Sequence, residues 1–122
     1  MIQSLTRLRV IDNSGALFVS CIKVLGGSKR KVSHIGDIIV TAIKRARPRK
    51  KAKKGEVRRG VIVLTRKSSK DFNGNTFVYG RNCLIVYNQK GQPLGNRIKG
   101  FLSELIREKG HYKLSMMGRM YT

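Results

Sequence analysis

GDIIVTAIKRARPRKKAKKGEVRRGVIVLT, the stretch from Gly36 to Thr65, places a basic segment between two apolar runs rich in Val and Ile. β-branched side chains favour the pleated, buried surface of a sheet. We therefore predict strands over Asp37–Ile43 and Val61–Thr65, entered through Gly36 and Gly60.

Similar apolar runs, bounded by turn-forming residues, predict further strands on both sides of this stretch. They cover Leu8–Ile11, Phe18–Leu25 and Cys83–Tyr87. A short strand over Thr76–Tyr79 is expected to form a hairpin, because Asp71–Asn75 contains an Asn-Gly turn signal. Five or six short strands with glycine-rich turns predict a mainly β fold, a small closed barrel, since closure removes exposed strand edges.

A short C-terminal helical segment is the one helix that the pattern supports. Phe101, Leu102, Leu105 and Ile106 fall at helical spacing, and Gly110 stands where a glycine cap would end the helix. We expect this helix to cover one opening of the barrel. The chain is predicted to be one domain over residues 1–122, with the barrel over about 1–98 and a helical tail over about 99–122.

The charge balance indicates the class of partner. The chain has 27 Lys and Arg against 6 Asp and Glu, a formal net charge of +21. Such a charge repels itself in a compact fold, so a polyanion is expected to neutralise it. Nucleic acid is favoured over an anionic membrane surface, because no long amphipathic basic helix and no apolar stretch of about 20 residues is visible. The N-terminus lacks a signal-peptide pattern, so the protein is expected to work in the compartment that makes it.

Two basic clusters are the candidate RNA-binding sites. The first lies within Lys44–Arg59, and Pro48 and Gly55 predict that it forms a loop or irregular hairpin arm between the third and fourth strands. Its basic residues are Lys44, Arg45, Arg47, Arg49, Lys50, Lys51, Lys53, Lys54, Arg58 and Arg59. Neutralising phosphates with such a segment releases condensed counterions, which drives binding. The second cluster is Lys29, Arg30 and Lys31. The alternatives are a solvated charged loop and an ordinary polar turn.

Catalytic and metal-binding patterns are missing from the sequence. Cys21 and Cys83 lie far apart in apolar runs, without the spacing of a zinc site. His34 and His111 have no evident acid or nucleophile partner, so each is interpreted as an RNA contact or a surface residue. No phosphate-binding loop or nucleotide-binding glycine motif appears. We expect no enzymatic activity, no cofactor and no metal.

Several motifs, in order along the first hundred residues, closely resemble the universal family of large-subunit ribosomal protein fourteen. They are Met1–Gln3, Asp12–Ala16, Cys21–Ser28, Gly36–Ile39, Pro48–Arg49 with Lys53–Gly55, Gly60–Val63 and Gln92–Ile98. The resemblance implies a five-stranded barrel with a projecting basic loop. It also implies binding to large-subunit ribosomal RNA and bridges to small-subunit ribosomal RNA. Neighbouring ribosomal proteins three and nineteen, and a ribosome-silencing factor, are further partners that the resemblance implies.

The resemblance also assigns roles to residues. Lys44–Lys54 matches the RNA-contacting loop of the family, and Asn96 and Arg97 match a Thr-Arg pair at the subunit interface, to which we add Lys99. Asn96 keeps a hydrogen-bonding side chain in place of the usual threonine, which leaves docking of the silencing factor open.

Two departures from the family indicate where the protein works. Lys99–Leu102 and Ser115–Met120 replace the usual sequences of the bacterial members. A divergent tail after an intact start favours an organelle-encoded, mitochondrial version, with a bacterial or plastid protein as the alternative. Two other functions remain open at this point, a free nucleic-acid-binding barrel and an RNA-modifying enzyme.

Overall fold

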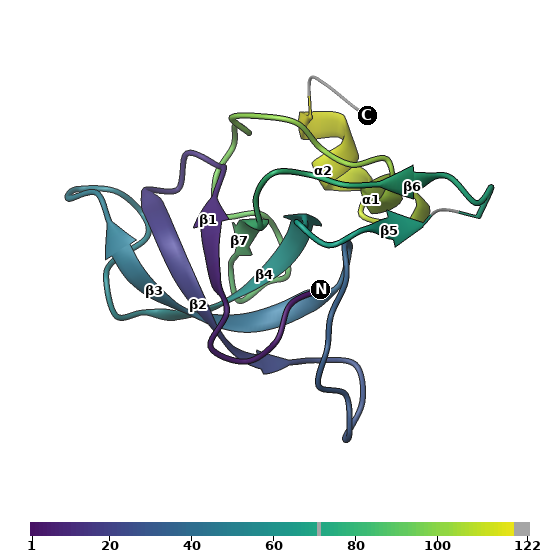
Figure 1. The fold of residues 1–122 in the computed structure, drawn as a ribbon. Helices are drawn as coiled ribbons and strands as arrows, with labels where there is room; N and C mark the ends of the chain where they lie inside the picture. The colour runs from purple at the N-terminus through teal and green to yellow at the C-terminus, as the bar shows by residue number, and fades with distance from the viewer. Residues whose placement is uncertain (71, 119–122) are drawn as a thin grey trace.

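Five strands close into a barrel in the computed structural model, which describes residues 1–70 and 72–118 (Figure 1). They are β1 (Arg7–Val10), β2 (Ala16–Val24), β3 (Ile38–Ala46), β4 (Val57–Leu64) and β7 (Cys83–Tyr87). Neighbouring strands pair antiparallel in the order β1-β2-β3-β4-β7, and β7 then pairs parallel to β1, with Arg9 opposite Cys83. The predicted mainly β, closed five-stranded fold is therefore confirmed.

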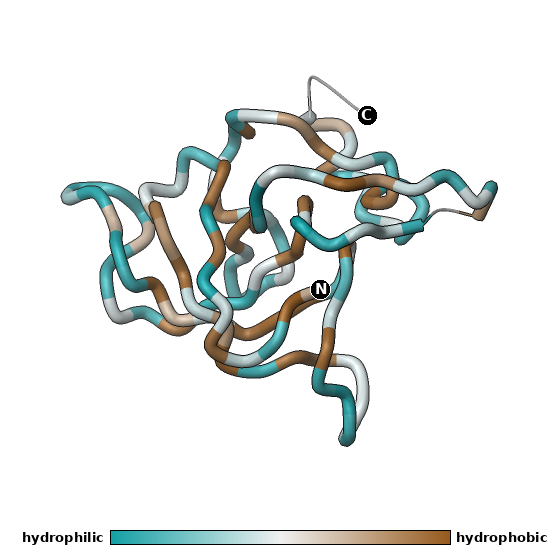
Figure 2. The backbone as a smooth tube through the Cα atoms, viewed as in Figure 1, coloured by the Kyte–Doolittle hydropathy of each residue, from teal (hydrophilic) through white to brown (hydrophobic). Residues whose placement is uncertain are grey.

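Alternating side chains of the strands fill the barrel. Leu8, Val19, Ile39, Ile62 and Leu84 are at most 1% exposed and belong to one apolar cluster inside it. Figure 2 shows these strands as largely hydrophobic, whereas the loops at the edges of the molecule are hydrophilic. Closure buries this interior without leaving an unpaired strand edge.

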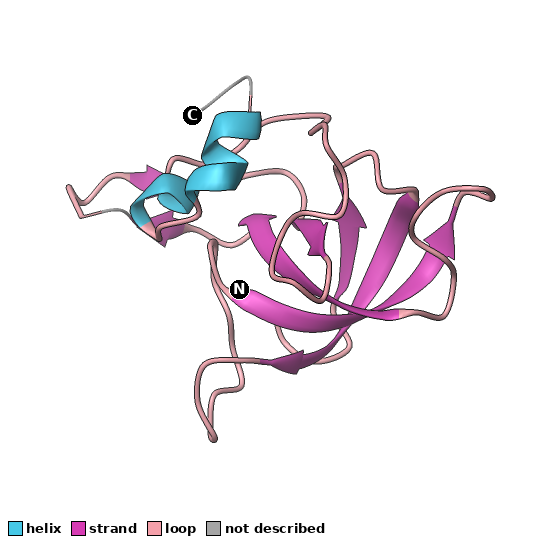
Figure 3. Ribbon diagram, turned by 180° about the vertical axis from the view of Figure 1, so that it is seen from behind, coloured by secondary structure: helices cyan, strands magenta, loops and turns pink. Residues whose placement is uncertain are grey.

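A second apolar cluster covers the outside of β4 and β7. Val61, Val63 and Ile85 alternate with the interior residues of these two strands and pack with the C-terminal segment instead. Both faces of β7 and of residues 61–64 of β4 are thus buried, which explains why these two stretches are continuously apolar. The expectation that the C-terminal helix covers a barrel opening is wrong, because the helical segment packs against this outer wall (Figure 3).

Up to residue 118, where the description of the C-terminal segment ends, it contains two short helices where one was expected, α1 (Leu105–Glu108) and α2 (Tyr112–Met117). Phe101 and Leu102 lie before α1, because the backbone there is held extended. The Lys99 N–H donates to the Ile11 carbonyl at 2.6 Å, and Ile98 forms an antiparallel β-bridge with Asp12.

The predicted glycine cap of α1 is confirmed. Gly110 has a φ of +89°. Its N–H bonds to the Arg107 carbonyl at 3.1 Å, and the His111 N–H bonds to the Ile106 carbonyl at 3.2 Å, the paired bonds of a Schellman ending.

The predicted hairpin near residue 76 is also present, as β5 (Ser69–Lys70) paired with β6 (Thr76–Phe77). It is shorter than expected, since its second strand ends at Phe77. Asp71 of the expected turn, and Arg119 and Met120 of the divergent tail, lie outside the described residues.

Candidate nucleic-acid interface

The first basic cluster divides between two strands and a loop. The prediction that all of Lys44–Arg59 forms a loop or irregular arm is wrong at its ends, because β3 continues through Lys44 and Arg45 and β4 includes Arg58 and Arg59. Pairing of Ala42 with Val57 extends the antiparallel ladder into the basic segment. The connection itself is residues 47–56, which we call the basic loop.

The backbone of the basic loop is docked on the barrel. The Arg47 N–H donates to the Gly15 carbonyl at 2.8 Å, and the Ala52 N–H donates to the Ser14 carbonyl at 3.0 Å. Ala52 is 1% exposed and belongs to the interior cluster. The loop is therefore held in one position while its cationic side chains stay exposed. Those side chains are Arg47, Arg49, Lys50, Lys51, Lys53 and Lys54.

A buried carboxylate organises the turn on which the loop sits. Asp12 is 6% exposed, and its Oδ1 accepts hydrogen bonds from the Ser14 N–H at 3.1 Å and the Ser14 hydroxyl at 2.5 Å. Its Oδ2 accepts the Val86 N–H at 3.2 Å, which ties the turn to β7. Burial raises the pKa of Asp12, and the hydrogen bonds from Ser14 and Val86 oppose that rise.

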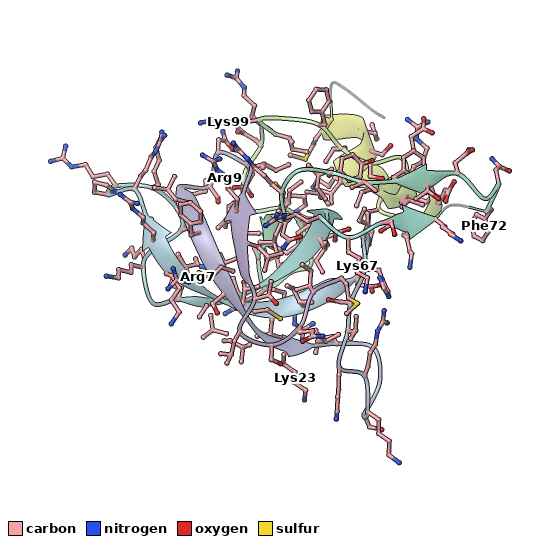
Figure 4. The ribbon with its side chains drawn as sticks, viewed as in Figure 1. Arg7, Arg9, Lys23, Lys67, Phe72 and Lys99 are labelled. Atoms are coloured by element: carbon pink, nitrogen blue, oxygen red, sulfur yellow. The ribbon has the colours of Figure 1, made fainter. Side chains whose placement is uncertain are left out.

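An open groove of about 950 Å³ runs beside the loop, across the outside of β1, β2 and β3, and we call it the arginine groove. Its seven cationic lining residues are Arg7, Arg9, Lys44, Arg45, Lys54, Arg66 and Arg81. None of the described residues that line it is acidic. Figure 4 shows Arg7 and Arg9 side by side on β1. The groove is thus a concave surface of one charge sign, which concentrates the field on an anionic ligand.

Four members of this groove were not among the predicted RNA-binding residues. They lie in separate parts of the sequence, outside the two predicted basic clusters, and the fold gathers them: Arg7, Arg9, Arg66 and Arg81. A signal existed for the first two, because Arg-Leu-Arg-Val alternates across the start of the strand predicted at Leu8–Ile11 and so directs both arginines to the face opposite the core.

A second hollow of about 490 Å³ joins the groove to Lys99, one of the expected subunit-interface residues. It shares Arg9, Arg45 and Arg81 with the arginine groove and adds Lys50 and Lys99. Lys99 lies beyond the end of β1 (Figure 4). The structure therefore brings much of the first basic cluster and Lys99 onto one face.

Asn96 and Arg97 are held close to the same turn by Asn13. The Asn13 Oδ1 accepts the Asn96 N–H at 2.9 Å and the Arg97 N–H at 3.2 Å, and its Nδ2 donates to the Asn96 Oδ1 at 2.6 Å. The Asn96 side chain therefore takes part in an internal contact, while the Arg97 and Lys99 side chains are exposed.

The second basic cluster lies elsewhere. Residues 26–35 form a loop at the bottom of the molecule, away from the basic loop (Figure 1). Arg30 forms an ion pair with Asp37, which also lies 3.6 Å from the Lys109 Nζ, whereas Lys29 and Lys31 are exposed. Arg58 and Arg59 line a third hollow with Tyr87. The structure thus distributes the predicted site residues over more than one surface.

The two cysteines and His111 serve the fold. Cys21 and Cys83 are buried free thiols, and burial raises the pKa of each. The His111 Nε2 is 2.6 Å from the Gly36 carbonyl. Within residues 1–70 and 72–118, no three His, Cys, Asp or Glu side chains are grouped so that they could hold a metal ion. The helices of that part of the chain are too short and too polar to cross a membrane.

Fold and surface together define a class, a small basic β-barrel protein whose concave cationic face suits a polyanion. The comparison with protein families agrees with this class. The family model described as Ribosomal protein L14p/L23e matches residues 1–122, and the chain therefore belongs to this family. Membership makes it a ribosomal protein of the large subunit, with ribosomal RNA and other ribosomal proteins as its general partners.

Proposed function

We propose that the protein binds large-subunit ribosomal RNA directly, through the basic loop and the arginine groove, as a non-enzymatic component of the particle. The observation that carries the proposal is the arrangement of cations on one face. Groove and loop hold exposed Arg and Lys around a concave surface whose described lining has no acidic residue. Binding there would be driven by phosphate neutralisation and counterion release, and Arg can also contact phosphate with two parallel hydrogen bonds.

The same face supports a role at the interface between subunits. Asn96, Arg97 and Lys99 form the candidate bridge to small-subunit ribosomal RNA, beside the second hollow. The Asn96 side-chain amide is already hydrogen-bonded to Asn13. Arg97 and Lys99 would therefore make the charged contacts with small-subunit ribosomal RNA. Ribosomal proteins three and nineteen, and a silencing factor, are proposed as protein partners on the strength of the family resemblance.

A mitochondrial particle is the proposed location, on the divergence of Lys99–Leu102 and Ser115–Met120. Organelle fractionation followed by detection of the protein in the large subunit would test this. Recovery from a bacterial or plastid large subunit would overturn it.

Direct RNA binding is tested with a loop variant that combines Arg47→Ala, Arg49→Ala, Lys50→Ala and Lys51→Ala. Its affinity for a large-subunit ribosomal RNA fragment is measured between about 50 and 200 mM salt. With around ten phosphate contacts, wild-type affinity should fall by roughly 10³-fold or more over this range. Loss of four contacts should reduce the slope of log K against log salt by about three to four.

The matched control removes the same charge elsewhere, with Lys67→Ala, Lys70→Ala, Lys90→Ala and Lys113→Ala, all at exposed positions. This control should change the slope much less, because long-range charge alone is screened at these salt concentrations. A wild-type complex that is insensitive to salt would contradict the proposal. Sedimentation separates the alternative, since a free nucleic-acid-binding module would leave the large subunit in high salt.

A further inference from the structure

An aromatic side chain stands among the cations of the arginine groove. Phe18 is 39% exposed on the outward face of β2, and it lines the groove together with the seven basic residues. Among the described residues of that lining, it is the one aromatic side chain. Because Phe18 faces outward and is 39% exposed, part of its ring is accessible to a ligand.

The register of the sheet places an arginine on each side of this ring. Phe18 pairs with Arg9 of β1 on one side and, at a register shift of the β2–β3 ladder, with Arg45 of β3 on the other. Directly paired residues of neighbouring strands have side chains about 5 Å apart at Cβ. The Arg9 guanidinium carbon lies 5.9 Å from the centre of the Phe18 ring, at the outer limit of a cation–π contact. Arg9 therefore lies over the ring, but at a distance beyond close stacking contact.

The combination of one π-face and many cations matches one ligand chemistry. A flat base can stack on the aromatic ring, and phosphates next to that base can pair with the surrounding guanidinium and ammonium groups. A paired helix offers the phosphates, but its bases are stacked inside. The groove volume of about 950 Å³ lies in the range of ligand-binding clefts, so it has room for more than a single phosphate.

We propose that the arginine groove binds an unpaired segment of RNA, with one base stacked on Phe18 and the flanking phosphates on Arg9, Arg45 and their neighbours. This inference rests on the proposed function, which it deepens by naming the form of RNA that the groove takes. Recognition is tolerant of base identity, because every base has a π-face and the groove presents mainly cations.

The test compares two RNA probes and three variants of the full-length chain. The probes are an oligouridylate of about twelve nucleotides, within the site sizes known for single-strand binding, and a paired RNA duplex of the same length. Phe18→Leu keeps an apolar side chain and removes the ring, whereas Phe18→Tyr keeps the ring. Phe72→Leu is the matched control, since Phe72 is 90% exposed on the β5–β6 hairpin, far from Arg9 (Figure 4).

Phe18→Leu should weaken binding of the oligouridylate by about fivefold to a hundredfold, the effect of losing one base–aromatic stack. It should leave duplex binding and the salt slope unchanged, because every cation remains. Phe18→Tyr and Phe72→Leu should both bind the single strand as the wild type does. Thermal unfolding confirms that each variant is folded.

Photo-crosslinking gives an independent measurement on the unaltered protein. An oligouridylate with one 5-iodouridine should crosslink to the peptide that contains Phe18, and excess unlabelled strand should suppress the crosslink. A crosslink that maps only to other peptides would overturn the inference.

Three other outcomes would also refute it, and they separate its failure from that of the proposed function. Equal loss of single-strand and duplex binding in Phe18→Leu would mean that Phe18 acts only through the fold. Normal single-strand binding in Phe18→Leu, together with a reduced salt slope in the loop variant, would leave RNA binding standing without the stack. Displacement of the strand by polyglutamate, with the same dependence on Phe18, would assign the groove to an acidic protein segment.

Discussion

Gly15→Ala is expected to displace the basic loop from the barrel. Gly15 has a φ of +102°, and a Cβ added there would lie 2.2 Å from the Lys50 Cβ and 2.8 Å from the Lys50 Cγ. The backbone conformation alone costs an L-residue about 1–2 kcal/mol. The overlap adds about 1–3 kcal/mol, since the Lys50 Cβ cannot move without the loop backbone. The total loss of stability is therefore about 2–5 kcal/mol.

Gly55→Ala separates these two contributions. Gly55 lies in the same loop with a φ of +89°, but no atom is within 4 Å of the position of its added Cβ. This variant should lose only the backbone part, about 1–2 kcal/mol. Adding Lys50→Gly to Gly15→Ala removes the overlapping atoms. After the effect of Lys50→Gly by itself is subtracted, the double variant should regain about 1–3 kcal/mol of stability relative to Gly15→Ala alone.

Urea unfolding followed by circular dichroism measures these differences, and thermal unfolding should show a fall in Tm on the order of 10 °C for Gly15→Ala. RNA affinity at a temperature well below the transition should also fall for Gly15→Ala and stay near wild type for Gly55→Ala, because only the first moves the cations of the loop. Equal destabilisation by the two variants would refute the reasoning, as would a Lys50→Gly substitution that restores nothing.

Two further predictions concern the outer wall of the barrel. Burial raises the pKa of Tyr87 to about 12. An unfolded tyrosine ionises near pH 10, so the wild type should lose stability between about pH 10 and 12, by up to about 1.4 kcal/mol per pH unit. Tyr87→Phe should not show this loss, and at pH 7 its stability should equal that of the wild type. Parallel falls in Tm of both proteins would count against this. Leu114→Ala should cost about 2–5 kcal/mol in urea unfolding, because Leu114 is fully buried and holds α2 against the wall. Met116→Ala, on the same helix but 86% exposed, should cost less than about 0.5 kcal/mol, and similar losses for the two would contradict the packing.

Local patterns were sufficient for the elements of the barrel. Runs of Val and Ile indicated the positions of β3, β4 and β7, and Gly110 indicated where α1 ends. Each of these features depends on neighbours within a few residues, so the sequence shows it directly. The boundaries were less certain, since pairing with Ala16 and Phe18 of β2 carried β3 beyond the apolar run and into the basic segment.

The candidate site was predicted only where its residues are contiguous. The ten cations of Lys44–Arg59 are conspicuous in the sequence, but Arg9, Arg66 and Arg81 are not. Pairing of β1 with β7, and the turn before β7, bring these three to one groove. The sequence likewise did not indicate that Asp37 pairs with Arg30 of the second cluster.

By itself, the amino-acid sequence determined the strands, the net charge of +21 and the family resemblance, because periodicity, composition and motif order are properties of the chain read in order. The tertiary structure alone decided which cations share a surface, that Phe18 lies among them, and that the helices cover a wall of the barrel. These features arise from contacts between residues far apart in the chain. Such contacts depend on strand order and register, which local side-chain preferences do not specify.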